Sequence, residues 1–197
     1  MMFCVLLAVT LALSFLAQEF LPVVTWAYEA RVLLVPVVFF AGAAALPFPL
    51  MLVFAFATGF VWDARHLVIE AAPAGGWFPG EVIEAGLPSP SFGYSILLYG
   101  LLGSLMQGIR PLFRRGRWEL PVLLCGIGTA ILLTAEHLWF CFLRGRFFFP
   151  EEIALHIGTT ALLSMMLSPI IFFLVHCLSQ LAGYRIRYDG LALRRAW

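Results

Sequence analysis

Residues 1–21, MMFCVLLAVTLALSFLAQEFL, are apolar almost throughout, and the strongly polar Gln18 and Glu19 come only near the end. A helix of about 20 residues spans the hydrocarbon core of a bilayer, which is about 30 Å thick. The stretch therefore predicts a transmembrane helix. It has no basic start and no cleavage site of small residues after a short apolar core, so we interpret it as a retained helix rather than a signal peptide.

Five further apolar stretches follow, and no segment between them is long enough for a water-soluble domain. We predict an all-α polytopic membrane protein that forms a single integral domain over residues 1–197. Its six transmembrane helices are expected at about 1–21, 31–46, 49–63, 92–110, 119–143 and 151–181, with an outer loop at 64–91 and a tail at 182–197. Only 12% of the residues are charged, against about 25% in soluble domains, which excludes a soluble enzyme.

The second and third helices are separated only by Leu46-Pro47-Phe48-Pro49, and the two prolines forbid a continuous straight helix. The pair forms either a tight transmembrane hairpin or a re-entrant hairpin, and both alternatives return the chain to the side it left. The loop at 64–91 is rich in Pro and Gly, which argues against a stable folded module. We expect it to cover the outer surface.

All cationic side chains of the chain are arginines apart from the histidines, and they cluster by loop. Two basic clusters follow the fourth and the sixth helices: Arg110, Arg114, Arg115, Arg117, Arg185, Arg187, Arg194 and Arg195. Cytoplasmic loops keep an excess of positive charge. Six crossings place both clusters on one side, so we predict that both termini are cytoplasmic. This basic face would attract anionic lipid, or equally an acidic patch on a cytoskeletal partner.

Three polar side chains are expected at membrane depth, where a charge is costly. Glu136 and His137 lie about 10 Å below the outer end of the fifth helix, and His156 lies about 7 Å deep on the sixth. A Glu136–His156 pair would satisfy two groups that hydrocarbon cannot solvate. We interpret it as an interhelical clasp, with a proton relay or a substrate site as the alternatives.

Small residues recur four apart on three of the expected helices, as they do where helices approach closely in lipid. The three stripes are Ala55, Gly59 and Asp63; Gly100, Ser104 and Gly108; and Gly126, Ala130 and Thr134. Packing within the chain is the favoured interpretation, and binding of a partner helix is the alternative. Pro169 should kink the sixth helix and free a backbone carbonyl.

Catalytic and metal-binding signatures fail on inspection. The four cysteines form no close pairs, so neither a disulfide framework nor a zinc site is expected. Glu136-His137 is not the His-Glu-x-x-His arrangement that places two zinc ligands on one helical face. We therefore predict no enzyme, no metal and no cofactor, and we expect no nucleic-acid partner.

One family shows the same order of features. The third expected helix contains Gly59-Phe60-Val61-Trp62-Asp63, and Ser91-Phe92-Gly93-Tyr94 opens the fourth. An acidic residue, Glu136, lies in the fifth helix, Pro169 lies among aromatic residues in the last, and Arg31 precedes an apolar helix. In these features the chain resembles the bacterial rod-shape-determining protein MreD family. It differs by inserting about 20 residues between Asp63 and Gly93.

The resemblance implies a non-enzymatic scaffold of the elongasome, the machinery that inserts peptidoglycan along the side wall of rod-shaped cells, in the bacterial inner membrane. It implies binding of the bitopic protein MreC and, with the MreB filament, of a RodA-type glycosyltransferase and a class B penicillin-binding transpeptidase. It also implies a bundle similar to the substrate-binding component of energy-coupling-factor transporters. The alternative function is a small-molecule carrier with Trp77, Glu136 and His156 as contacts; an intramembrane hydrolase ranks third.

Overall fold

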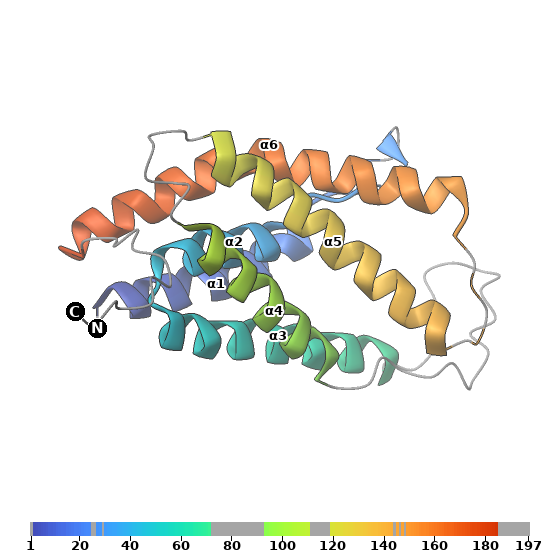
Figure 1. Ribbon diagram of the computed structural model, residues 1–197, viewed down its shortest axis with the longest axis horizontal. Helices are drawn as coiled ribbons and strands as arrows, with labels where there is room; N and C mark the ends of the chain where they lie inside the picture. The colour runs from blue at the N-terminus through green and yellow to red at the C-terminus, as the bar shows by residue number, and fades with distance from the viewer. Residues whose placement is uncertain are drawn as a thin grey trace, which may run out of the picture.

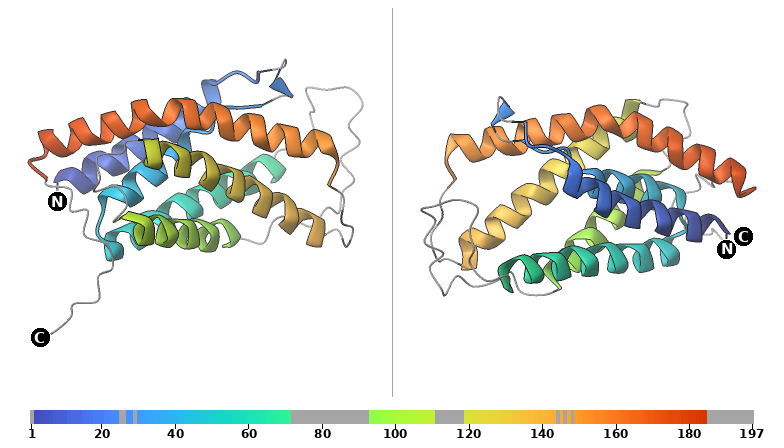
Figure 2. Two further views of the ribbon diagram at one scale, coloured as in Figure 1. Left: turned by 45° about the horizontal axis from the view of Figure 1, so that its top comes forward. Right: turned by 180° about the vertical axis from the view of Figure 1, so that it is seen from behind.

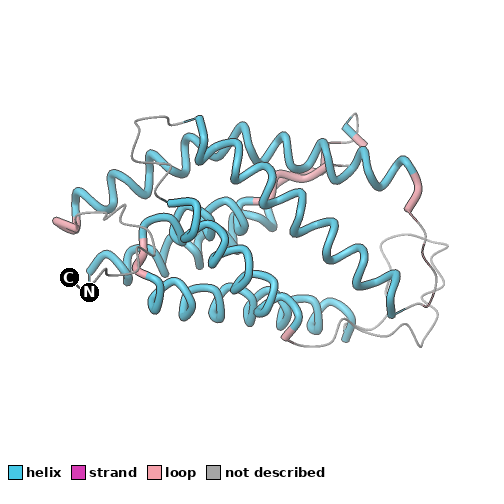
Figure 3. The backbone as a smooth tube through the Cα atoms, in the orientation of Figure 1, coloured by secondary structure: helices cyan, strands magenta, loops and turns pink. Residues whose placement is uncertain are grey.

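The structure, a computed structural model, is a bundle of helices that run roughly along one long axis (Figure 1). It describes residues 2–24, 27–28, 30–71, 93–110, 119–143, 145, 147 and 149–184, with the side chains of 66–71 outside the description. Six helices lie in these ranges: α1 Met2–Phe20, α2 Leu34–Ala45, α3 Phe48–Ala71, α4 Tyr94–Ile109, α5 Glu119–Leu143 and α6 Glu151–Leu181. A short connection joins α2 to α3 (Figure 3).

The predicted helix positions are confirmed for most of the chain. The bounds of α5 and α6 agree with the expected ranges, and those of α1, α2 and α4 differ by one to three residues. The expected end of the third helix at 63 is wrong, because α3 continues to Ala71. Asp63 and Arg65 suggested the end of the helix, but the sequence contains no helix breaker between Asp63 and Pro73. Arg65 forms an ion pair with Glu19 of α1 at 2.7 Å.

Four of the helices are long and apolar enough to cross a membrane: α1, α3 over Phe48–Arg65, α5 and α6. The other two, α2 and α4, have 12 and 16 residues. At a rise of 1.5 Å per residue these two helices are about 18 and 24 Å long, shorter than the hydrocarbon core. The chain is thus an all-helical membrane protein with two short helices between longer ones.

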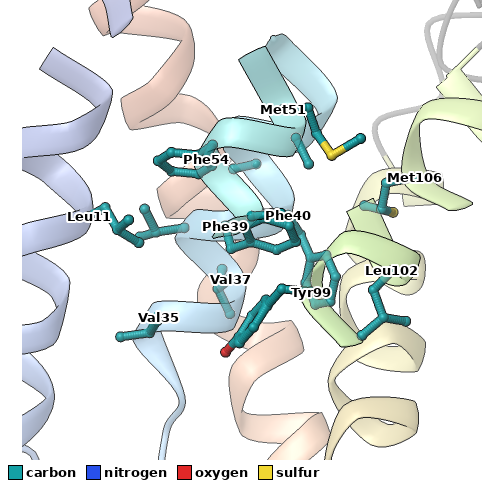
Figure 4. Close-up of a cluster of buried hydrophobic side chains, with 14 of the residues drawn as sticks. Leu11, Val35, Val37, Phe39, Phe40, Met51, Phe54, Tyr99, Leu102 and Met106 are labelled. Atoms are coloured by element: carbon teal, nitrogen blue, oxygen red, sulfur yellow. The ribbon is translucent and has the colours of Figure 1, made fainter. Parts of the chain in front are cut away.

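The shortest helix, α2, lies at the centre of the bundle. Every residue from Val35 to Ala45 is buried, and α2 contacts each of the other five helices. Figures 1 and 2 show it enclosed by the longer helices. Its Phe39 ring packs against Phe54 of α3 at 5.8 Å and against Tyr99 of α4 at 4.9 Å (Figure 4). A helix buried on all sides needs no lipid-facing side, which explains its uniformly apolar sequence.

Both ends of α2 are capped by polar side chains from three other helices. The first N–H groups of a helix and its last carbonyls have no partner within the helix, and hydrocarbon offers none. At the start, the Val35 N–H donates to Oε1 of Gln18 at 3.1 Å, and the preceding Leu33 N–H donates to Oγ of Ser164 at 3.1 Å. At the other end, Nε2 of Gln107 donates to the carbonyls of Ala43 and Leu46, each at 2.7 Å.

The helices alternate in direction, so the start of α1 and the end of α6 lie at the same end of the bundle. The Phe3 ring stacks on Tyr184, which follows α6, with centroids 4.6 Å apart and planes 5° from parallel. At the opposite end, the Glu19–Arg65 ion pair joins the end of α1 to α3. This arrangement agrees with an even number of passes along the bundle axis.

The Gln107 contacts predict a specific stability effect. Gln107→Leu would leave two buried carbonyls without donors, at about 1–3 kcal/mol per unsatisfied group. We expect the free energy of unfolding in detergent micelles, measured by denaturant titration, to fall by about 2–6 kcal/mol. The matched control is Gln180→Leu, at an exposed position on α6. Equal effects of the two substitutions would contradict this account of the α2 end.

Candidate functional site

Asp63 and Gly93, which lie 30 residues apart in the sequence, are in direct contact. Oδ2 of Asp63 accepts a hydrogen bond from the Gly93 N–H at 2.7 Å, and the Asp63 side chain is only 7% exposed. Gly93 precedes α4 with φ 104°, a left-handed conformation that suits glycine and not L side chains. Asp63 therefore fixes the point at which α4 begins beside α3.

Gly59, one turn before Asp63, brings the same two helices together. A Cβ atom placed on Gly59 would lie 2.4 Å from Cα of Ile96 and 2.5 Å from its backbone nitrogen, closer than atoms can approach. Gly59 thus allows backbone-to-backbone contact between α3 and the first turn of α4. The three residues that carry the family resemblance at this point, Gly59, Asp63 and Gly93, form one junction.

A small cleft of about 30 Å³ lies beside this junction, between α3, the start of α4 and the second half of α5. Its lining contains two acidic side chains and four aromatic rings. The lining residues are Trp62, Asp63, Tyr94, Ser95, Glu136, Trp139 and Phe140. The predicted site residues Asp63 and Glu136 therefore face one space.

Hydrogen bonds and ring contacts hold the three helices around the cleft. The indole Nε1–H of Trp62 donates to Oε1 of Glu136 at 3.1 Å, which joins α3 to α5. The Tyr94 hydroxyl donates to the carbonyl of Ala135 at 2.8 Å, and the Tyr94 ring stacks on Trp139 with centroids 4.5 Å apart. These contacts join α3 to α5 and α4 to α5, so the cleft exists only when all three helices are packed.

The expected Glu136–His156 pair is not formed. Glu136 bonds to Trp62, whereas Nδ1 of His156 lies 2.9 Å from the carbonyl of Tyr28 in the segment between α1 and α2. The helices α5 and α6 are close near Gly126 and Met165 but diverge toward the Glu136 and His156 ends (Figure 1). The two side chains therefore face different neighbours.

The sequence analysis did not identify Trp62 as the partner of Glu136, although Trp62 lies next to Asp63 in the motif that begins at Gly59. An indole N–H is a donor that needs a partner when it is buried, and this requirement could have indicated the contact.

The predicted site residue His137 lies apart from the cleft. It lies beside the Sγ of Cys141 at 3.4 Å and packs edge-on against Phe149 at 5.4 Å. It does not line the cleft.

Arg110, which the sequence analysis assigned to the cytoplasmic basic face, is 4% exposed in the structure. Its Nη1 donates to Oε1 of Gln107 at 3.2 Å, next to the end of α2 that Gln107 caps. The sequence placed it at the edge of a basic loop without showing which way it turns. The other arginines of that face, and the loop residue Trp77, lie outside the described residues: Arg114, Arg115, Arg117, Arg185, Arg187, Arg194 and Arg195.

Pro169 lies inside α6, which continues without a break from Glu151 to Leu181. A proline cannot donate to the carbonyl four residues before it, here that of Met165. The hydroxyl of Ser168 donates to that carbonyl at 2.8 Å. The expectation of a freed carbonyl that another group must satisfy therefore agrees with this geometry.

The three small-residue stripes differ in what they contact. Gly59 packs against α4, and a Cβ on Gly126 would lie 3.0 Å from Sδ of Met165 on α6. On α4, a Cβ added to Gly100 or to Gly108 would meet no atom of the described residues within 4 Å. The α4 stripe is therefore not used for packing within the described part of the chain.

Among the described residues, no group of three or more His, Cys, Asp or Glu side chains is placed to hold a metal ion. Comparisons of the chain with models of protein families, with curated proteins and with solved structures find no match. The cleft and its neighbours therefore have to be interpreted from their own chemistry.

The close approach at Gly59 predicts a strong effect of a single methyl group. Gly59→Ala should lower the free energy of unfolding by about 1–3 kcal/mol, because α3 and α4 must separate. Gly108→Ala is the matched control, since the added methyl group has open space and alanine favours the helix by up to about 1 kcal/mol. Thermal unfolding in detergent would measure both; a stable Gly59→Ala variant would refute the tight junction.

Proposed function

We propose that this chain is a non-enzymatic membrane scaffold of the bacterial cell-wall elongation machinery, similar to MreD. The observation that carries the proposal is the junction of Gly59, Asp63 and Gly93, because the residues shared with that family position two helices against each other. Neither Gly59 nor Gly93 has a side chain for chemistry, and Asp63 uses one oxygen to hold the α4 start. A structural role of this kind suits a protein that organises others.

A packed interior favours the scaffold over the carrier. The centre of the bundle is filled by side chains of α2 and its neighbours, including Phe39, Phe40 and Tyr99, which are completely buried. The cleft at Glu136 has a volume of about 30 Å³, whereas pockets for drug-sized ligands have about 300–1,000 Å³. His156, the second contact proposed for a carrier, does not line it.

The outward side of α4 fits a partner helix. Leu97, Leu101 and Leu105 are exposed there, and the uncovered Gly100 and Gly108 lie on the same helix. Small residues between larger apolar ones let a second helix approach closely in lipid. We propose that the membrane-spanning helix of an MreC-like protein packs here, and that RodA-type and transpeptidase partners assemble around the pair with the MreB filament.

The number of membrane crossings and the side on which the termini lie are part of the same proposal. We propose six crossings of the bacterial inner membrane, with α2 as a short crossing inside the protein, a bundle similar to the substrate-binding component of energy-coupling-factor transporters, and cytoplasmic termini. The stacking of Phe3 on Tyr184 supports an even number of crossings, since it joins the start of α1 to the end of α6. The arginine-rich segments after α4 and α6 would then face anionic lipid or MreB.

Partner capture tests the function directly. Affinity purification of the tagged chain from native membranes, followed by mass spectrometry, should recover an MreC-like protein. Replacing both Gly100 and Gly108 by Ile should reduce that recovery about tenfold, the effect of losing about 1.4 kcal/mol of helix contact. Gly158→Ile is the matched control, because Gly158 is an exposed glycine of α6 with open space around it. Recovery of an ATPase pair instead would favour the carrier.

The orientation has its own test. In a background without the four native cysteines, a thiol introduced by Arg115→Cys should stay unlabelled by a membrane-impermeant maleimide in intact spheroplasts and react after permeabilisation. A thiol introduced by Glu151→Cys, at the opposite end of the bundle, should react in both conditions. Labelling of Arg115→Cys in intact spheroplasts would contradict the cytoplasmic basic face.

A further inference from the structure

One of the two short helices, α4, lies at the surface of the bundle. Its outward leucines, Leu97, Leu101 and Leu105, are each more than half exposed. The helix has 16 residues and is about 24 Å long. Its exposed side is therefore apolar but shorter than a hydrocarbon core of about 30 Å. The other short helix, α2, does not meet lipid in the same way, because protein surrounds it.

The longer helices match a thicker bilayer. On α5 the large exposed apolar side chains extend from Leu123 to Phe142, a rise of about 28 Å. On α1 they extend from Met2 to Phe20, a rise of about 27 Å. In Figures 1 and 2, α6 extends past both ends of α4 along the long axis of the bundle. A bilayer that fits these helices is about 6 Å thicker than α4 is long.

Both ends of α4 are fixed to the interior of the bundle. At its start, the Gly93 N–H donates to Oδ2 of Asp63 at 2.7 Å. Near its other end, Nε2 of Gln107 donates to the carbonyls of Ala43 and Leu46, each at 2.7 Å. The helix therefore cannot slide along the bundle axis. Tilting it would shorten its span across the membrane further.

Side chains at the ends of α4 do not compensate for its length. A short helix is accommodated when long polar side chains at its ends reach the headgroups, when the bilayer thins, or when copies associate. At the start, Gly93 has no side chain, and the Tyr94 hydroxyl donates to the carbonyl of Ala135. At the other end, Gln107 bonds to α2, and Arg110 is only 4% exposed. Among the described residues, no end side chain thus reaches outward from α4.

The apolar surface ends at different heights on α4 and α5. The Tyr94 ring stacks on Trp139 with centroids 4.5 Å apart, so these two residues lie at one level of the bundle. Whereas α4 begins at Tyr94, α5 continues past Trp139 to Leu143, about 6 Å further. Phe140 and Phe142 on this extension are exposed. A flat bilayer that covers these rings would also cover the start of α4 and the polar groups next to it.

We propose that the chain thins the bilayer beside α4, where the hydrocarbon layer is about 24 Å thick, while the lipid beside α5 and α6 keeps about 30 Å. The occupant of the outward face of α4 is thus lipid with short or disordered acyl chains. The inference concerns the chain with no partner bound, and a partner helix on α4 would replace this lipid. It does not depend on the scaffold proposal, because thinning and partner capture can each fail without the other.

The membrane depths of two nitroxide labels test the thinning. In a background without the native cysteines, the labels are attached to Leu97→Cys on α4 and to Leu138→Cys on α5, which are both exposed positions. The purified chain is placed in dioleoylphosphatidylcholine discs that hold one copy each. The depth of each label follows from electron paramagnetic resonance power saturation with oxygen and a nickel chelate.

The two arrangements predict opposite signs for the difference in depth. Leu97 lies three residues inward from Tyr94, and Leu138 lies one residue inward from Trp139. In a flat bilayer the Leu97→Cys label is therefore about 3 Å deeper than the Leu138→Cys label. With a surface that follows the start of α4, it is about 3 Å shallower. A deeper Leu97→Cys label would overturn the proposal.

Longer acyl chains give a second measurement. In dierucoylphosphatidylcholine discs, whose hydrocarbon layer is thicker, the Leu138→Cys label should become deeper. The Leu97→Cys label should keep its depth, because α4 fixes the local thickness. An equal deepening of both labels would show that the bilayer beside α4 follows the bulk thickness, and it would overturn the proposal.

A third position covers a failure of the Leu97→Cys variant to fold. Leu101→Cys lies one turn further inward on α4, and its label should be about 3 Å deeper than the Leu138→Cys label with thinning and about 9 Å deeper without it. The same label detects association of copies. Spin–spin broadening of its spectrum in vesicles would show that a second copy covers α4, which would overturn the assignment of this face to lipid.

Discussion

The rest of the bundle depends on the burial of α2, whose two ends are capped by side chains of other helices. This 12-residue helix is too short to reach both membrane surfaces, and each residue from Val35 to Ala45 is buried by protein. Its terminal backbone groups therefore end where water does not reach, and each unsatisfied group there would cost free energy. Gln18, Ser164 and Gln107 supply the missing partners from α1, α6 and α4. The longer helices are thus held around α2 by hydrogen bonds as well as by packing.

The same packing positions the candidate site. Phe39 of α2 contacts Tyr99 of α4, Tyr99 contacts Trp62 of α3 at 6.3 Å, and Trp62 bonds to Glu136 of α5. This chain of contacts links the bundle centre to the cleft. A side chain in the core that is held from several sides cannot easily turn toward a different partner. Trp62 is therefore held where its indole N–H reaches Glu136.

The site and the outward face of α4 suit different tasks and lie on different sides of one helix. Tyr94, Ser95 and Tyr99 face the cleft or the core, whereas Leu97, Leu101 and Leu105 face outward. One side of α4 thus holds the bundle together, while the other side faces outward. The Asp63–Gly93 bond fixes the start of this helix.

Hydropathy along the sequence determined the helical class and the bounds of α5 and α6, because transfer of a segment into apolar surroundings depends on its own residues. Pro47 and Pro49 determined the break between α2 and α3. The motif on which the family resemblance rests also singled out Gly59, Asp63 and Gly93 together. Only the tertiary structure decided the central place of α2, the extension of α3, the burial of Arg110 and the partners of Glu136 and His156. The physical reason is that protein interior and lipid are both apolar. The sequence therefore shows that a helix is buried, but not which side meets which neighbour.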